Sequence, residues 1–201
     1  MGHQQALRCW RTSLVSATTK VSLELTLMHG RTSVNDMSFM QWLIDRGADV
    51  KTRSFLDSST LSKAIVHGNM DVVHFLLAQE EDINRGDLLH CAAQRENQHE
   101  GAMLVEELVE MGAEIDAHRY LHEDAIRFRY FSLLGTPLHT SCHEMNFPIA
   151  KALLDHGANP RCKMLLQSEE TGPTPLELAA QTGDPKWIEW FMAKDLLNAR
   201  L

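Results

Sequence analysis

Histidine and cysteine side chains at helical spacing are the first candidates for chemistry in this sequence. His139, Cys142 and His143 lie in one short stretch. Residues at positions i and i+4 share one face of a helix, so the two imidazoles could ligate a metal ion together. A tetrahedral site needs further ligands, and the sequence offers no convincing fourth one. We therefore predict no metal at this position.

Other catalytic patterns are equally weak in the sequence. It contains no nucleophile elbow, no phosphate-binding glycine loop and no separated carboxylate pair in a plausible cleft. A nucleophilic cysteine and its histidine base assemble in space, so sequence spacing alone does not decide that case. We predict no catalytic residue and no cofactor, and thus a protein that is not an enzyme.

Composition narrows the class of partner. The chain has 201 residues, of which 44% are hydrophobic and 23% charged, which is typical of one globular domain or two small ones. A net charge of -8 disfavours nucleic acid as the main partner. The four scattered cysteines fit free thiols in a reducing compartment, so we expect an intracellular protein, cytoplasmic and/or nuclear. No apolar run is long enough to span a membrane.

The stretch from 135 to 160 shows which elements position these residues. Thr136 suits a helix N-cap and Pro137 the first helical turn. A second helix with the apolar pair Leu153-Leu154 follows, and Gly157 ends it, since glycine enters the left-handed conformation without steric penalty. One such helix pair cannot bury its apolar face alone, so we expect neighbours of the same kind.

Copies of this unit recur along the chain in the same order. The second-helix pair recurs as Leu43-Ile44, Leu76-Leu77, Leu108-Val109 and Phe191-Met192, and the glycine stop recurs at Gly47 and Gly112. The pattern resembles the ankyrin repeat family, whose period is about 33 residues. The resemblance implies an all-α solenoid of stacked helix pairs with finger-like turns. We place five repeats at about 25–53, 57–84, 87–116, 135–161 and 173–195.

The ends of the chain are predicted to close this array. Residues 1–25 are expected to form a capping helix, although their basic, Ser- and Thr-rich composition also faintly resembles a transit peptide. The tail 196–201 either folds back as a small lid or meets a partner or further chain. We expect the protein to be a monomer on its own.

The resemblance also assigns structural roles. In the family, the histidine of each helix opening hydrogen-bonds the opening threonine and nearby backbone, so these histidines are structural rather than catalytic. Asp87 is expected to replace threonine as an N-cap, and four extra residues within 96–101 to lengthen a turn. The motif residues are Thr26, His29, Gly47, His90, Gly112, Thr136, Pro137, His139, Gly157, Thr174 and Pro175.

Two connections depart from the family pattern. The segment 117–135 is unusually long, contains both tyrosines, and is either a contact surface or a short helix folded onto the stack. The connection 161–172 has an apolar tip that we interpret as a second contact or a hydrophobic latch.

The resemblance implies that the protein binds another protein through its concave first-helix face and its finger loops. This makes it a scaffold or adaptor module; the alternative is a regulatory or substrate-recruiting part of an enzyme system, such as a signalling or ubiquitination complex. Carried over by position, the contact residues are Arg53, Phe55, Lys63, Val66, His67, Cys91, Gln94, Arg95, Tyr120, Arg129, Tyr130, Thr140, His143, Glu144 and Gln181.

Overall fold

A computed structural model describes residues 34–54, 57–80, 82–121 and 132–198, and side chains as far as residue 193. Within these ranges the regular secondary structure is helical apart from one short hairpin and two isolated bridges. Several predicted features lie outside the described residues: the segment 1–25, Thr26, His29, Phe55, Arg129, Tyr130 and the last three residues of the tail.

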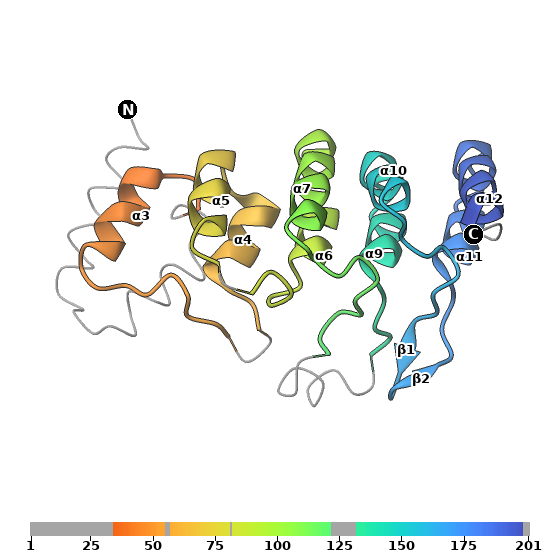
Figure 1. Ribbon diagram of the computed structural model, residues 1–201, viewed down its shortest axis with the longest axis horizontal. Helices are drawn as coiled ribbons and strands as arrows, with labels where there is room; N and C mark the ends of the chain where they lie inside the picture. Colours follow the sequence, from red (N-terminus) through yellow and green to blue (C-terminus); the bar gives the residue numbers. More distant parts are fainter. Residues whose placement is uncertain (1–33, 55–56, 81, 122–131, 199–201) are drawn as a thin grey trace.

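Consecutive helices form pairs that lie in a row along the long axis of the molecule (Figure 1). A helix α3 (Met37–Ile44) precedes the first complete pair. We call the earlier member of each pair the first helix and the later member the second helix. The pairs are α4 (Thr60–His67) with α5 (Met70–Leu77), α6 (Leu88–Ala93) with α7 (Gln98–Glu110), α9 (Pro137–His143) with α10 (Phe147–Asp155), and α11 (Pro175–Gln181) with α12 (Pro185–Asn198).

The pairs stack through contacts between equivalent helices. The first helices α4, α6, α9 and α11 touch one another in sequence order, and α7 packs against α10 in the second layer. One continuous hydrophobic core runs through these contacts, and Leu104, Leu138 and Leu153 in it are completely buried. Gly101 permits the close approach of α7 to α10, because a Cβ there would lie 2.5 Å from Ile149 Cδ1. The predicted all-α stack of helix pairs is confirmed.

The predicted helix boundaries rest on local capping chemistry. Thr136 precedes α9 with Pro137 in the first turn, and the Thr174 side chain accepts a hydrogen bond from the Glu177 backbone at the start of α11. The glycines after α3, α7 and α10 have φ values of 90°, 94° and 93°. These values lie in the left-handed region that favours glycine, so Gly47, Gly112 and Gly157 end their helices as predicted.

The four extra residues of the third unit lengthen a helix rather than a turn, which corrects our prediction. The helix α7 has 13 residues, compared with 8 in α5 and 9 in α10. Asn97 caps α7 through its side chain, as Asn69 and Asn146 cap the equivalent helices. Four residues add roughly one helical turn, so the apolar face of α7 keeps its orientation toward the core.

Asp87 does not act as the predicted side-chain cap. It occupies the N-cap position of α6, but its backbone is left-handed, with a φ of 52°, and its carboxylate makes no capping hydrogen bond. The carboxylate instead accepts hydrogen bonds from the Tyr120 backbone N–H at 3.2 and 3.3 Å. Asp87 therefore fixes the start of the long connection that follows the third unit.

The connection 161–172 forms a hairpin of β1 (Leu165–Leu166) and β2 (Glu169–Glu170), with Leu165 opposite Glu170. Leu134 extends it, because Leu134 and Leu165 exchange two backbone hydrogen bonds of 2.8 Å. The hairpin projects from the helix row on the same side as the other connections (Figure 1). The end of the long connection is thus joined to the next finger through backbone groups.

The C-terminal helix also runs further than predicted. α12 continues to Asn198, where the sequence suggested a separate tail from residue 196. Its buried Trp187 packs against Phe147 of α10 at a ring centroid distance of 5.4 Å, and Phe191 stacks on Trp187 at 5.8 Å. These aromatic contacts hold the last helix against the preceding unit.

Candidate functional site

The predicted contact surface divides into side chains that are open and side chains that are buried. Exposed members lie on three first helices: Lys63 and His67 on α4, His143 and the adjoining Glu144 at the end of α9, and Gln181 on α11. Partly exposed members are Val66, Gln94 and Thr140. We call this set of side chains the first-helix face.

Cys91 and Arg95 are not on this face, which corrects our placement of them. Both have a relative exposure of 6%. The Cys91 thiol lies 3.8 Å from the Gly86 carbonyl oxygen, and burial raises its pKa to about 11. It therefore stays protonated near neutral pH and behaves as a small core residue.

Arg95 is buried because its guanidinium joins two neighbouring units. It donates hydrogen bonds to the carbonyl oxygens of Ala64, Ile65 and Gly68 at 3.3, 2.6 and 2.7 Å. It also pairs with the Glu100 carboxylate at 2.9 and 2.6 Å. A guanidinium has five N–H donors, and these contacts occupy all of them. Arg95 thus caps the C-terminal end of α4 and is not available to a partner.

The finger residues are also partly committed to internal contacts. Arg53 pairs with Glu80 at 2.9 Å, with both side chains at least 80% buried. Arg119 donates its backbone N–H to the Gly135 carbonyl, and its guanidinium stacks over the Tyr120 ring at 4.7 Å. Tyr120 is therefore held on the third unit while remaining partly exposed.

Two leucines flank the undescribed part of the long connection. Leu121 is 48% exposed and Leu133 is 50% exposed. Leu133 directly precedes Leu134, which joins the hairpin, and Leu121 follows Tyr120 at the start of the same connection. Large apolar side chains left in water at a loop are suited to contact with another protein.

The histidine and cysteine positions do not assemble a reactive centre. His139 is buried, whereas the His143 side chain is 83% exposed, so the two imidazoles do not face a common site. Burial raises the pKa of the Cys142 thiol to about 12 and lowers the pKa of His139 to about 4. A thiol and an imidazole shifted in these directions form no thiolate–imidazolium pair. In the part of the chain that the structure describes, no three metal-binding side chains come together.

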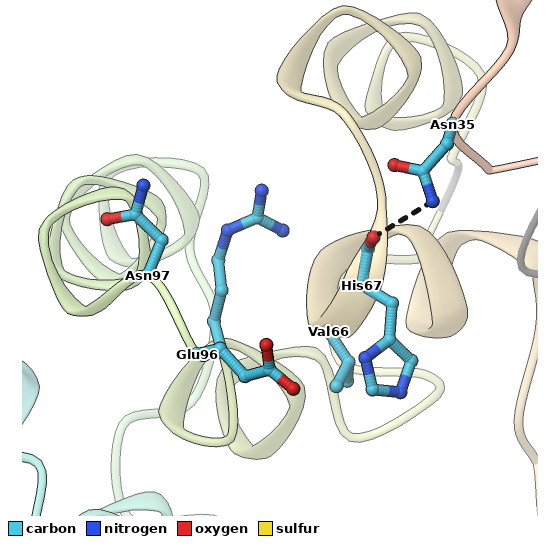
Figure 2. Close-up of a pocket in the computed structure, with 6 residues that line it drawn as sticks. Asn35, Val66, His67, Glu96 and Asn97 are labelled. Carbon is cyan, nitrogen blue, oxygen red and sulfur yellow. Dashed lines mark hydrogen bonds between the residues drawn. The ribbon is translucent and has the colours of Figure 1, made fainter.

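A cleft that the sequence did not reveal lies beside the first-helix face (Figure 2). Its volume is about 260 Å³. One wall is the last turn of α4, and the other is the turn before the lengthened α7. The local sequence pattern gave no signal for this cleft, because its walls come from two different units. The lining residues are Asn35, Val66, His67, Arg95, Glu96 and Asn97.

None of the helices in the described ranges has the length and apolarity that a bilayer crossing requires.

Comparison with known proteins agrees with this architecture. The chain is 33% identical over 148 residues to the mitochondrial disaggregase of Bos taurus. The aligned region covers 73% of this chain and 20% of that protein, so the chain spans about a fifth of its relative's length. A profile of the ankyrin repeat matches residues 135–165, which include α9, α10 and the start of the hairpin. The chain therefore contains an ankyrin repeat at residues 135–165.

Proposed function

We propose that this chain is a protein-binding module that recognises its partner through the first-helix face and the adjoining fingers. The observation that supports the proposal is the contrast between buried and exposed polar side chains on the same first helices. Side chains that join units are buried and hydrogen-bonded, whereas Lys63, His67 and His143 project from the same helices into solvent. A rigid row of helices presents such side chains at fixed spacing, which lowers the entropy lost on binding.

The array proposed here has five repeats. Four are the helix pairs already described, and α3 is the second helix of the first repeat, because its Phe39, Met40 and Leu43 are buried like the equivalent residues of α5. The finger side adds Tyr120, Leu121 and Leu133 to the binding surface. This surface combines charged, aromatic and aliphatic groups, a mixture that favours a folded or partly unfolded protein as the partner.

Affinity capture with two matched variants tests this proposal. Lys63→Glu changes an exposed lysine on the first helix α4, and Lys151→Glu makes the same change on the second helix α10. The purified parent and variants are immobilised, incubated with lysate of the source cell, and the retained proteins are quantified. We expect Lys63→Glu to lose a protein that the parent and Lys151→Glu both retain. Equal retention by the two variants would contradict a binding site on the first-helix face.

A second candidate function follows from the similarity to a mitochondrial disaggregase. In this candidate, the chain recruits aggregated protein as a substrate for enzymatic activity located elsewhere. The exposed leucines of the finger side favour it, because aggregated proteins display apolar segments. The relative is named as a mitochondrial protein. The sequence of this chain favours the cytoplasm or nucleus, and its compartment stays a prediction.

Sedimentation with an aggregated protein tests the second candidate. The chain is mixed with heat-aggregated luciferase or with native luciferase and centrifuged. We expect the parent to sediment with the aggregate only, and Leu121→Ser with Leu133→Ser to reduce the sedimented fraction. A parent that stays in the supernatant would exclude substrate recruitment and leave the first proposal standing.

A further inference from the structure

The cleft between α4 and α7 has the chemistry of a cation-binding pocket. Figure 2 shows the Glu96 carboxylate facing Val66 and His67 across the open space. Asn35 closes one side and donates a hydrogen bond to the His67 carbonyl at 3.2 Å. Glu96 is exposed, and within the described residues it has no ion-pair partner at salt-bridge distance.

The positive charge closest to the cleft is already neutralised. Arg95 lines the cleft, but its five donors are occupied by three carbonyl oxygens and Glu100. Its guanidinium therefore cannot attract an anion or pair with Glu96. Because Glu100 balances Arg95, Glu96 gives the lining a net negative charge.

We propose that this cleft binds an arginine side chain from a basic segment of the partner protein. The inference rests on the proposed protein-binding function and adds a chemical class of partner to it. The aliphatic part of arginine would lie on Val66, and the planar guanidinium would reach the Glu96 carboxylate beside the His67 ring. A guanidinium pairs with a carboxylate through two parallel hydrogen bonds, a geometry that a lysine ammonium does not match. The chain's net charge of -8 also favours a basic segment.

Fluorescence anisotropy with a defined probe tests this proposal. The probe is a labelled twelve-residue peptide of glycine, serine and arginine, and its counterparts carry lysine or citrulline at the arginine positions. Citrulline preserves the shape of arginine and removes its charge. The protein variants are Glu96→Gln and Glu106→Gln; both positions are exposed in the third unit, but Glu106 lies on α7 and does not line the cleft.

We expect the arginine peptide to bind the full chain saturably, and more tightly than the lysine and citrulline peptides. Glu96→Gln should weaken this binding by about fivefold or more, because it removes a charged hydrogen bond, whereas Glu106→Gln should leave it within about twofold. The side-chain amide NMR signals of Asn35 and Asn97 should shift on titration. Absence of binding, equal binding of the citrulline peptide, or equal weakening by the two variants would each overturn the proposal.

The experiment separates failure of this inference from failure of the proposed function. If Glu96→Gln retains the captured protein that Lys63→Glu loses, the first-helix face binds the partner and the cleft does not. If the arginine peptide binds at Glu96 while Lys63→Glu retains the captured protein, the cleft proposal stands and Lys63 is excluded from the contact with the partner.

Discussion

The Nε2 atom of His139 lies 3.0 Å from the carbonyl oxygen of Pro173, in the next unit of the array. The other ring nitrogen, Nδ1, accepts from the Thr136 backbone N–H at 2.9 Å. A carbonyl oxygen only accepts, so the proton must sit on Nε2 and the imidazole is neutral. One buried ring therefore caps its own helix and joins it to the following repeat.

The same link recurs between other neighbouring units. His90 Nε2 lies 3.0 Å from the Gly135 carbonyl oxygen, and Ser62 Oγ donates to the Gly86 carbonyl oxygen at 3.0 Å. In each case the acceptor directly precedes the N-cap of the next first helix. The polar residue of each helix opening thus fixes the spacing between units, and with it the geometry of the first-helix face.

Replacing this ring should destabilise the array. We expect His139→Ala to lower the free energy of unfolding by about 2 to 4 kcal/mol, because it empties a buried site and removes hydrogen bonds at both ring nitrogens. His143→Ala on the same helix should change it by less than about 0.5 kcal/mol, since that side chain is exposed. Urea denaturation measures both, and similar losses in the two variants would contradict the structural role of His139.

The buried histidines should also make stability depend on pH. Burial lowers the pKa of His90 to about 3 and that of His139 to about 4, whereas an unfolded histidine titrates near 6.5. Below pH 6.5 the unfolded chain therefore binds protons that the folded chain does not, so stability falls as pH falls toward 4. Above pH 6.5 both states are neutral and this contribution is constant. Each histidine should contribute up to about 1.4 kcal/mol per pH unit.

A comparison of pH profiles isolates one of these groups. The free energy of unfolding of the parent and His139→Gln is measured by urea denaturation between pH 7.5 and 5. The pKa values of Asp87 and Asp116 are raised by burial, and their opposing contribution is common to both proteins. We expect a shallower loss of stability in His139→Gln, and parallel profiles would show that His139 is not neutral and buried.

Arg95 provides a second test of the links between units. Arg95→Ala would leave three carbonyl oxygens and Glu100 without their donor, so we expect a loss of about 2 to 4 kcal/mol. Arg46→Ala should cost less than about 1 kcal/mol, because Arg46 is exposed and stacks over the Trp42 ring. Thermal unfolding of both variants measures these losses. An Arg95→Ala variant that is as stable as the parent would contradict the buried linking role of Arg95.

A cavity in the core of the unit formed by α9 and α10 should destabilise the protein. Leu153 has no exposed surface, and Leu153→Ala should lower the free energy of unfolding by about 2 to 5 kcal/mol. The loss should extend to neighbouring helices, because repeats share stability across their interfaces. Native-state hydrogen exchange of α7 and α10 would report it. Leu133→Ala is the matched control, since this leucine is 50% exposed and should be nearly neutral.

The sequence predicted the helix pairs well because their signals are local. Thr136 with Pro137 marks a helix start, and Gly157 marks a stop through its own backbone preference. Ile149, Leu153 and Leu154 recur at helical spacing within α10 and indicate its buried face. Each of these features depends on residues a few positions apart.

The features that the sequence missed depend on contacts between units. Asp87 would cap α6 in isolation, but its carboxylate instead accepts hydrogen bonds from the backbone N–H of Tyr120, which is distant in the chain. Arg95 would be a surface residue of the turn after α6, but the end of α4 lies against it. The residues within 96–101 were predicted to form a loop, but Asn97 caps a longer helix that starts at Gln98. The cleft follows from these contacts, so it could not be predicted from the local pattern.

Hydroxyl-radical footprinting of the captured complex tests the central proposal most directly. Free and partner-bound chains are oxidised, and the modification of individual side chains is quantified by mass spectrometry. We predict that binding protects His143 on the first-helix face and Leu133 on the finger side, while Met103 and Met111, exposed on or just after the second helix α7, stay as reactive as in the free chain. Protection of Met103 and Met111 with unchanged His143 and Leu133 would place the partner on the second helices and contradict the proposed binding surface.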